Sequence, residues 1–166
     1  MLSFSRLAMV SAVLVCASSA SAAEPLTIAG SLVGNGADLV MVGNDNVLTI
    51  LQEAPLGADA FNSVRVRLTG DRNGGAAGRS FGGAALATGL LPGHLTQSGL
   101  GNLMDISVDG SDNLFAASQT GSANQLAASI VGHGNQSAVR QTGNGNIANF
   151  SQVGNGNMVS ITQTSW

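Results

Sequence analysis

The feature that most constrains the fold is a repeat of eleven residues that begins at Gln97 and continues almost to the end of the chain. Six units follow one another without a gap, and a short stretch of four residues closes the series. A fixed short period is typical of solenoids, in which each unit stacks on the next and buries a continuous core. Every unit has glycine at its third position (Gly99, Gly110, Gly121, Gly132, Gly143 and Gly154) and asparagine at its sixth (Asn102, Asn113, Asn124, Asn135, Asn146 and Asn157).

Within each unit the residue pattern predicts one β-strand and one turn. Positions eight and ten are apolar in every unit except for Ser137, while position eleven is a small polar residue in every unit except for Arg140. Side chains two residues apart share one face of a strand, so the apolar pair points inward and the polar residue outward. The Gly-x-x-Asn segment supplies the turn, because glycine adopts positive φ freely and asparagine tolerates it.

The first position of the units suggests a true period of 22 residues. It is glutamine in alternate units, whereas the units between them carry Val108, Ile130 and Gln152. Two strands per coil would stack each glutamine on the next at about 4.7–4.9 Å, the spacing at which side-chain amides form ladders. We therefore predict an all-β, amyloid-forming β-solenoid of two-strand coils, with a core that is half apolar and half amide. The predicted glutamine positions are Gln97, Gln119, Gln141, Gln152 and Gln163, which join the glycines and asparagines above as structural ladder residues.

Residues 23–96 carry a degenerate form of the same pattern. Residues 41–52 make one full unit, and residues 64–73 make another that is five residues out of phase. The stretch 74–89 is mostly glycine and alanine, a composition typical of a flexible linker. We therefore divide the part that follows residue 22 into a degenerate region with a Gly/Ala-rich linker, 23–96, and a regular solenoid, 97–166.

Residues 1–22 are predicted to be a secretory signal peptide. Arg6 supplies a positive charge, residues 7–17 form an apolar stretch, and Ala20 and Ala22 are the small residues that precede a cleavage site. The apolar stretch is too short to span a membrane as a helix, and no second one follows. The mature chain would be secreted, without cysteine and without membrane insertion.

The composition argues against nucleic-acid binding and against catalysis. Six basic and nine acidic residues give a net charge of −3, which does not suit a phosphate backbone. The chain has no lysine or tyrosine, and the acidic residues of its repeats, Asp105, Asp109 and Asp112, are better explained as solvated than as a catalytic pair. His94 and His133 have no partner nearby in sequence. We expect no enzymatic activity, no cofactor and no metal site.

The repeat resembles the curlin repeat, Gln-x-Gly-x-Gly-Asn-x-Ala-x-x-x-Gln. Residues 141–152 match it at every fixed position, and a second copy begins at Gln152 and closes at Gln163. The resemblance implies a major or minor subunit of a curli fibre, exported through an outer-membrane pore of a Gram-negative bacterium. It further implies assembly at the cell surface into an amyloid fibre that serves adhesion and biofilm, with itself and a nucleating subunit as partners.

A structural fibre protein is therefore our first hypothesis for the function. Its low charge, its lack of lysine and the absence of a charged capping repeat after the last unit all favour strand addition at an open edge. The alternative is a monomeric secreted solenoid with a Ser/Thr-lined binding face, for example an ice-binding face. Its outward pairs would be Thr96/Ser98, Ser118/Thr120, Arg140/Thr142 and Thr162/Thr164.

Overall fold

In the computed structural model the described residues are 12–17 (backbone only), 26–30, 34–55, 60–75, 79–83 and 89–166. Over these residues the chain is all-β, as the repeat predicts, and contains no helix. Its strands are β1 (Ala12–Ala17), β2 (Leu26–Gly30), β3 (Gly36–Val42), β4 (Leu48–Glu53), β5 (Ser63–Thr69), β6 (His94–Leu100), β7 (Leu103–Asp109), β8 (Leu114–Ser122), β9 (Gln125–Val131), β10 (Gln136–Asn144), β11 (Ile147–Val153) and β12 (Met158–Thr164).

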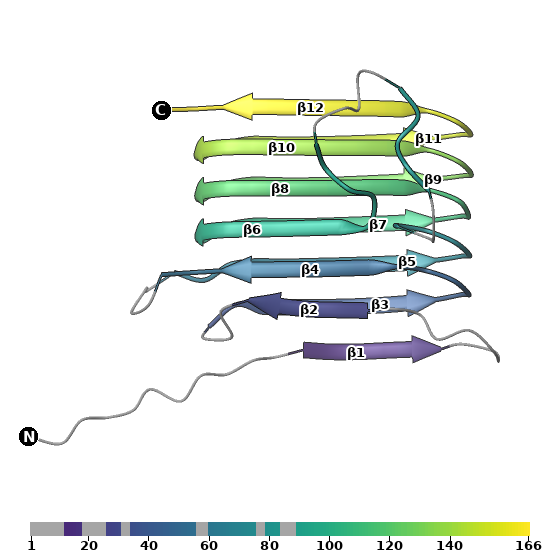
Figure 1. Cartoon of the computed structure of the whole chain (residues 1–166), viewed down its shortest axis with the longest axis horizontal. Coiled ribbons are helices and arrows are strands. Elements are labelled where there is room, and N and C mark those ends of the chain that lie inside the picture. The colour runs from purple at the N-terminus through teal and green to yellow at the C-terminus, as the bar shows by residue number, and fades with distance from the viewer. Residues whose placement is uncertain (1–11, 18–25, 31–33, 56–59, 76–78, 84–88) are drawn as a thin grey trace, which may run out of the picture.

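The strands form two parallel sheets that face each other across the core (Figure 1). One, here the odd sheet, has the order β1-β3-β5-β7-β9-β11, and the other, the even sheet, has the order β12-β10-β8-β6-β4-β2. From β2 to β12 the chain crosses from one sheet to the other after every strand, so each pair of successive strands makes one coil. The described residues therefore form a β-solenoid in which every strand stacks on the strand two places earlier.

In the regular part of the solenoid, stacked residues are 22 positions apart. Gln97 lies on Gln119 and Gln119 on Gln141 in the even sheet, and the odd sheet has the same spacing from β7 to β11. The sheets continue without a break into β2–β5, so these strands add coils to the same stack. The N-terminal units depart from the eleven-residue spacing because extra residues are inserted between strands, while the strands themselves remain in register.

Two insertions account for the irregular coils. Partners in β3 and β5 are 27 residues apart, such as Gly36 and Ser63, five more than in the regular coils. Partners in β5 and β7 are 40 residues apart, such as Ser63 and Leu103, 18 more than in the regular coils. The longer insertion leaves the stack after Gly74, which bridges to Val47, and returns at Gly93, whose carbonyl accepts a hydrogen bond from Thr49 N–H at 2.8 Å.

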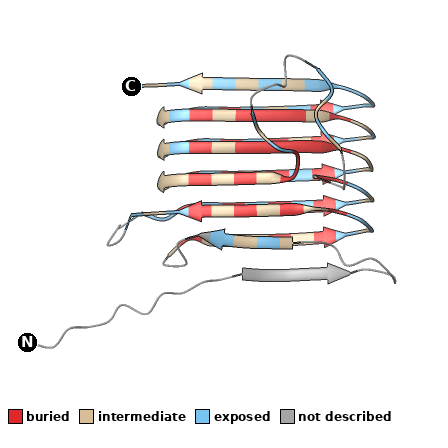
Figure 2. Cartoon of the chain, viewed as in Figure 1, coloured by how far each residue is buried: buried red, intermediate tan, exposed pale blue. Residues whose placement is uncertain are grey.

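The core lies between the two sheets, and buried residues recur at alternate positions along the strands (Figure 2). Leu39, Val66, Ile106, Ala128 and Phe150 form one of its columns in the odd sheet. Phe115 is 1% exposed, and Phe150 packs on the core from the last coil, as the alternation predicts. Because a single coil consists of only two short strands, burial of its inward side chains depends on stacking against the next coil.

Strand β1 lies within the predicted signal peptide. It pairs in parallel with β3, with Ala12 beside Ala37 and Ala17 beside Val42, and forms the end of the odd sheet. The rest of residues 1–22 lies outside the described residues. The signal peptide and the boundaries at residues 22 and 96 remain predictions, although the sheets themselves run across residue 96.

Candidate functional site: the amide ladders

The asparagines form two continuous columns along the whole stack, one at each corner where the chain passes between the sheets. In each step the Oδ1 of one asparagine accepts the backbone N–H of the asparagine in the next coil, at 2.9–3.1 Å. The internal members are buried, so these bonds satisfy amides that would otherwise be costly to bury. The columns are Asn35, Asn62, Asn102, Asn124 and Asn146, and Asn46, Asn73, Asn113, Asn135 and Asn157.

The repeated glycines stack beside the asparagines and depend on them. Their carbonyl oxygens accept the Nδ2 amides of the asparagines in the preceding coil, for example Gly121 from Asn102 at 2.9 Å and Gly132 from Asn113 at 2.9 Å. A Cβ atom on Gly99, Gly110 or Gly121 would collide with the carbonyl oxygen of the glycine in the next coil. The six glycines of the regular units have φ between 101° and 130°, a region that other residues avoid.

Four of the predicted glutamines, and Gln52 with them, form a single ladder inside the even sheet. Each Nε2 donates at 2.8 Å to the Oε1 of the next glutamine in the series Gln52, Gln97, Gln119, Gln141, Gln163. The same Nε2 donates its second proton to a backbone carbonyl of the odd sheet, as Gln119 does to Leu103 at 2.9 Å. The glutamines therefore join successive coils and also join the two sheets.

Gln152 does not belong to this ladder, contrary to the sequence analysis. It lies in β11 of the odd sheet, where its neighbour in the preceding coil is Ile130. Its Nε2 donates to the carbonyl of Gln136 at 3.2 Å, but its buried Oε1 has no hydrogen-bond partner. In the ladder, each Oε1 accepts from the glutamine of the preceding coil. Gln152 Oε1 has no partner because Ile130, which has no side-chain N–H, lies at that place.

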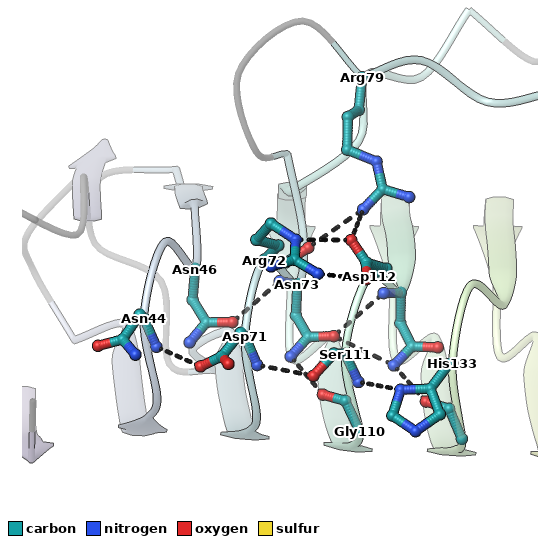
Figure 3. A network of polar contacts seen from close by, with 12 residues as sticks. Asn44, Asn46, Asp71, Arg72, Asn73, Arg79, Gly110, Ser111, Asp112 and His133 are labelled. Atoms are coloured by element: carbon teal, nitrogen blue, oxygen red, sulfur yellow. Dashed lines mark hydrogen bonds and ion pairs between the residues drawn. The ribbon is translucent and has the colours of Figure 1, made fainter.

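A third polar column follows the turn at one edge of the solenoid (Figure 3). Each side chain in it accepts the backbone N–H of the turn in the preceding coil: Asn44 donates to Asp71, Asp71 to Ser111, and Ser111 to His133 Nδ1 at 3.2 Å. His133 N–H donates in turn to Asn155 Oδ1 at 2.9 Å. His133 therefore accepts the same backbone hydrogen bond as Asp71, Ser111 and Asn155 do in their coils, which fits a structural role.

Asp112 is the centre of the charged contacts at the same edge. Its carboxylate accepts two hydrogen bonds from Arg72, at 2.7 and 2.9 Å, and one from Arg79 at 2.9 Å. The hydrogen bonds and the charge of Arg72, with a smaller effect of Arg79, hold the pKa of Asp112 below its ordinary value. The same contact raises the pKa of Arg72. Asp112 is therefore charged and engaged by two arginines.

Sequence reasoning missed two classes of site residue. Asn35 and Asn62 complete an asparagine column, yet Asn62 follows no Gly-x-x segment. Its only signal is that an apolar residue, Val64, comes two positions later, as in every regular unit except the one with Ser137. The left-handed residue of the turn is the fifth position and not the asparagine. It is occupied by glycine in several units but also by Asp45, Arg72, Asp112 and Ala123, all with φ between 55° and 63°.

The other polar candidates form no site in the part of the chain that the structure describes. Asp105 lies 3.5 Å from Arg65, which also pairs with Asp38 on the outer face of the odd sheet. No group of three His, Cys, Asp or Glu side chains among the described residues could hold a metal ion. A search of the same residues for a helix of membrane-spanning length and hydropathy finds none.

Among known protein families, the curlin associated repeat matches residues 132–164. The chain carries a curlin repeat. The matched segment contains β10–β12 together with Gln141, Gln152 and Gln163, the residues on which the resemblance in sequence rested. No curated protein and no solved structure matches the chain.

The curlin repeat identifies which residues of the coil are structural. The glycine and asparagine of each repeat pair with their counterparts in neighbouring coils, and so does the glutamine of every second repeat. The same contacts extend beyond the matched segment to the preceding coils, including the N-terminal ones that contain Asn35, Asn46 and Gln52.

Proposed function

We propose that this protein is a structural subunit of an extracellular curli-type amyloid fibre that serves adhesion and biofilm formation. The observation that carries the proposal is that the ladders run the length of the stack with a fixed polarity. Each asparagine donates to the asparagine of the coil before it, whereas each glutamine donates to the glutamine of the coil after it. The last coil therefore offers Oδ1 acceptors on Asn146 and Asn157 and an amide donor on Gln163.

Open ends of this kind can be extended by a further chain. β12 pairs only with β10, and its residues alternate between exposed and half-buried, although the equivalent positions of β8 and β10 are mostly buried. Val159 and Ile161 are half-buried for the same reason. Strand addition would bury these side chains, continue the ladders and remove the exposed edge. The wider role follows from the curlin repeat: export after removal of residues 1–22, passage through an outer-membrane pore, and a nucleating partner subunit.

The alternative, a monomeric solenoid with a Ser/Thr-lined binding face, is less well supported. Ser98, Thr120, Thr142 and Thr164 do stack in one outward column. The next column on that face contains Arg140, and the long insertion lies on the same sheet, where Gly82 N–H donates to Gln136. The even sheet therefore does not present two adjacent, uninterrupted columns of hydroxyl groups.

The proposal is tested by dilution of the mature chain, residues 23–166, out of denaturant. We expect a lag phase, thioflavin-positive fibres, and a meridional reflection at about 4.7–4.8 Å with strands perpendicular to the fibre axis. A soluble, folded monomer that shows no fibres over several days at high concentration would refute the fibre proposal.

A further inference from the structure

In the 18-residue insertion, the described residues 79–83 and 89–92 lie over the outer face of the even sheet (Figure 1). Its described residues reach strands that follow it in the stack: Gly82 N–H donates to Gln136 Oε1 in β10 at 2.7 Å, and a Cβ on Gly83 would lie 3.6 Å from Met158 Sδ in β12. Arg79 binds Asp112 in the turn before β8. We call residues 79–83 and 89–92 the flap.

Burial beneath the flap differs from burial at equivalent positions elsewhere. Leu114, Ala116 and Ala138 point away from the core, since Phe115, Ala117 and Val139 point into it, yet they are 3%, 2% and 0% exposed. On the odd sheet, equivalent outward residues such as Leu103 and Ile147 are 43% and 62% exposed, and Ala127 is exposed as well. The flap therefore covers an apolar patch, formed by Leu114, Ala116 and Ala138, that the repeat alone would leave open.

An open patch of this composition is suited to contact with another sheet. Two sheets pack face to face at about 10 Å, and small, uncharged side chains allow the closest approach. The patch consists of one leucine and two alanines, and the nearest charged group of β8 and β10 is Arg140. Without the flap, the patch of one solenoid could lie against the same patch of another.

We propose that the flap is an in-chain guard that prevents a second copy of this protein from packing side by side on the even sheet. The inference rests on the proposed fibre function and concerns lateral contacts, not the growth of the fibre at its ends. With the flap in place, lateral association is limited to the opposite sheet, whose outer face carries Asp38, Arg65 and Asp105 over part of its length.

The register defines a clean test. Gly74 and Gly93 occupy consecutive positions of the same coil, one on each side of the insertion. A Cβ built on Gly74 would lie 3.6 Å from the Cα of Gly93. Deletion of residues 75–92 therefore removes 18 residues and leaves a coil of 22, the regular length. We expect the deletion variant to form fibres that bundle, with a width by electron microscopy roughly twofold or more that of the full chain.

Two further variants make the result specific. Adding Leu114→Asp and Ala138→Asp to the deletion should restore the original fibre width, because charges on the patch prevent sheet-on-sheet packing. Arg79→Ala with Gln136→Ala keeps the insertion but removes two flap anchors, and should also promote bundling; this variant decides the question if the deletion variant does not fold. Unchanged width in both the deletion and the anchor variants, or bundles that persist with the two aspartates, would overturn the proposal.

If the full chain forms no fibres, the fibre proposal fails but the guard can still be tested. The deletion variant should then form side-by-side dimers by analytical ultracentrifugation, and the full chain should remain monomeric. Monomers in both cases would refute the guard.

Discussion

At the scale of single residues, the amide ladder separates two glutamines that look alike in the sequence. Gln141 lies between Gln119 and Gln163 and is bonded to both, whereas Gln152 has an unpaired Oε1. Replacing Gln141 by leucine keeps the bulk but leaves an amide group of each neighbour without a partner, at about 1–3 kcal/mol each if buried. Gln141→Leu should therefore lengthen the lag phase and lower the denaturant midpoint of the fibres.

Gln152→Leu is the matched control for this ladder prediction. It replaces an amide whose Oε1 is buried without a partner by a side chain similar to Ile130 in the preceding coil, so its effect on the denaturant midpoint should be small or stabilising. Equal losses for the two variants would show that the glutamine ladder does not stabilise the stack.

The glycines provide a second contrast at the same scale. Gly121 has a φ of 112°, and a Cβ there would collide with the carbonyl oxygen of Gly143. Gly145 has a φ of 67° and open space around it, and Ala123 occupies the same turn position with a φ of 56°. Gly121→Ala should prevent stacking, at above about 4 kcal/mol, whereas Gly145→Ala should cost only about 1–2 kcal/mol. Circular dichroism and fibre yield would distinguish the two; similar yields would contradict the close-packed glycine column.

At the scale of the element, Asp112 connects the flap to the solenoid and makes that contact sensitive to acid. Arg72 and Arg79 hold the pKa of Asp112 below its ordinary value, so the charged form stabilises the folded state above the pKa of the unfolded chain. That contribution is lost as the pH falls through the lower, folded pKa. We expect protease cleavage within residues 79–92 to increase below about pH 4, and Asp112→Asn to show the same cleavage at neutral pH. A pH-independent cleavage rate in the unmodified chain would exclude this anchor.

The elements themselves could be predicted where the repeat is intact, and for a physical reason. Each strand of β7–β12 follows one asparagine, and alternation over a few residues then defines which side chains face inward. The N-terminal coils were harder because insertions change the spacing while the strands stay in register. The flap could not be predicted at all: the glycines and alanines of residues 74–89 indicate a linker, and the contacts of the flap with Asp112 and Gln136 depend on strands far away in sequence.

At the scale of the whole molecule, the two ends of the solenoid are not equivalent. The C-terminal end offers the edge of β12, whereas at the other end β1 covers the edge of β3. Within the even sheet the glutamine ladder stops at Gln52, because the residue beneath it is Gly30. A second copy that adds to β12 and β11 would meet Gly30 and either β1 or β3, depending on whether residues 1–22 have been removed.

Removal of residues 1–22 should therefore control how readily chains join end to end. β1 occupies the outer edge of β3 from Ala37 to Val42, with parallel pairing along six residues, and an occupied edge cannot accept β11 of another chain. We expect a chain that begins at residue 23 to assemble with a shorter lag than the chain that retains residues 1–22. We also expect fibres of the shorter chain to seed further assembly of the shorter chain efficiently. Thioflavin kinetics at matched concentrations would measure both. A full-length variant in which residues 12–17 are replaced by an equally long Gly/Ser sequence is the control. It keeps the length of the chain but removes the strand that covers β3, so it should assemble like the shorter chain. If it assembles as slowly as the full chain, β1 does not block the edge and the order of the odd sheet has no part in assembly.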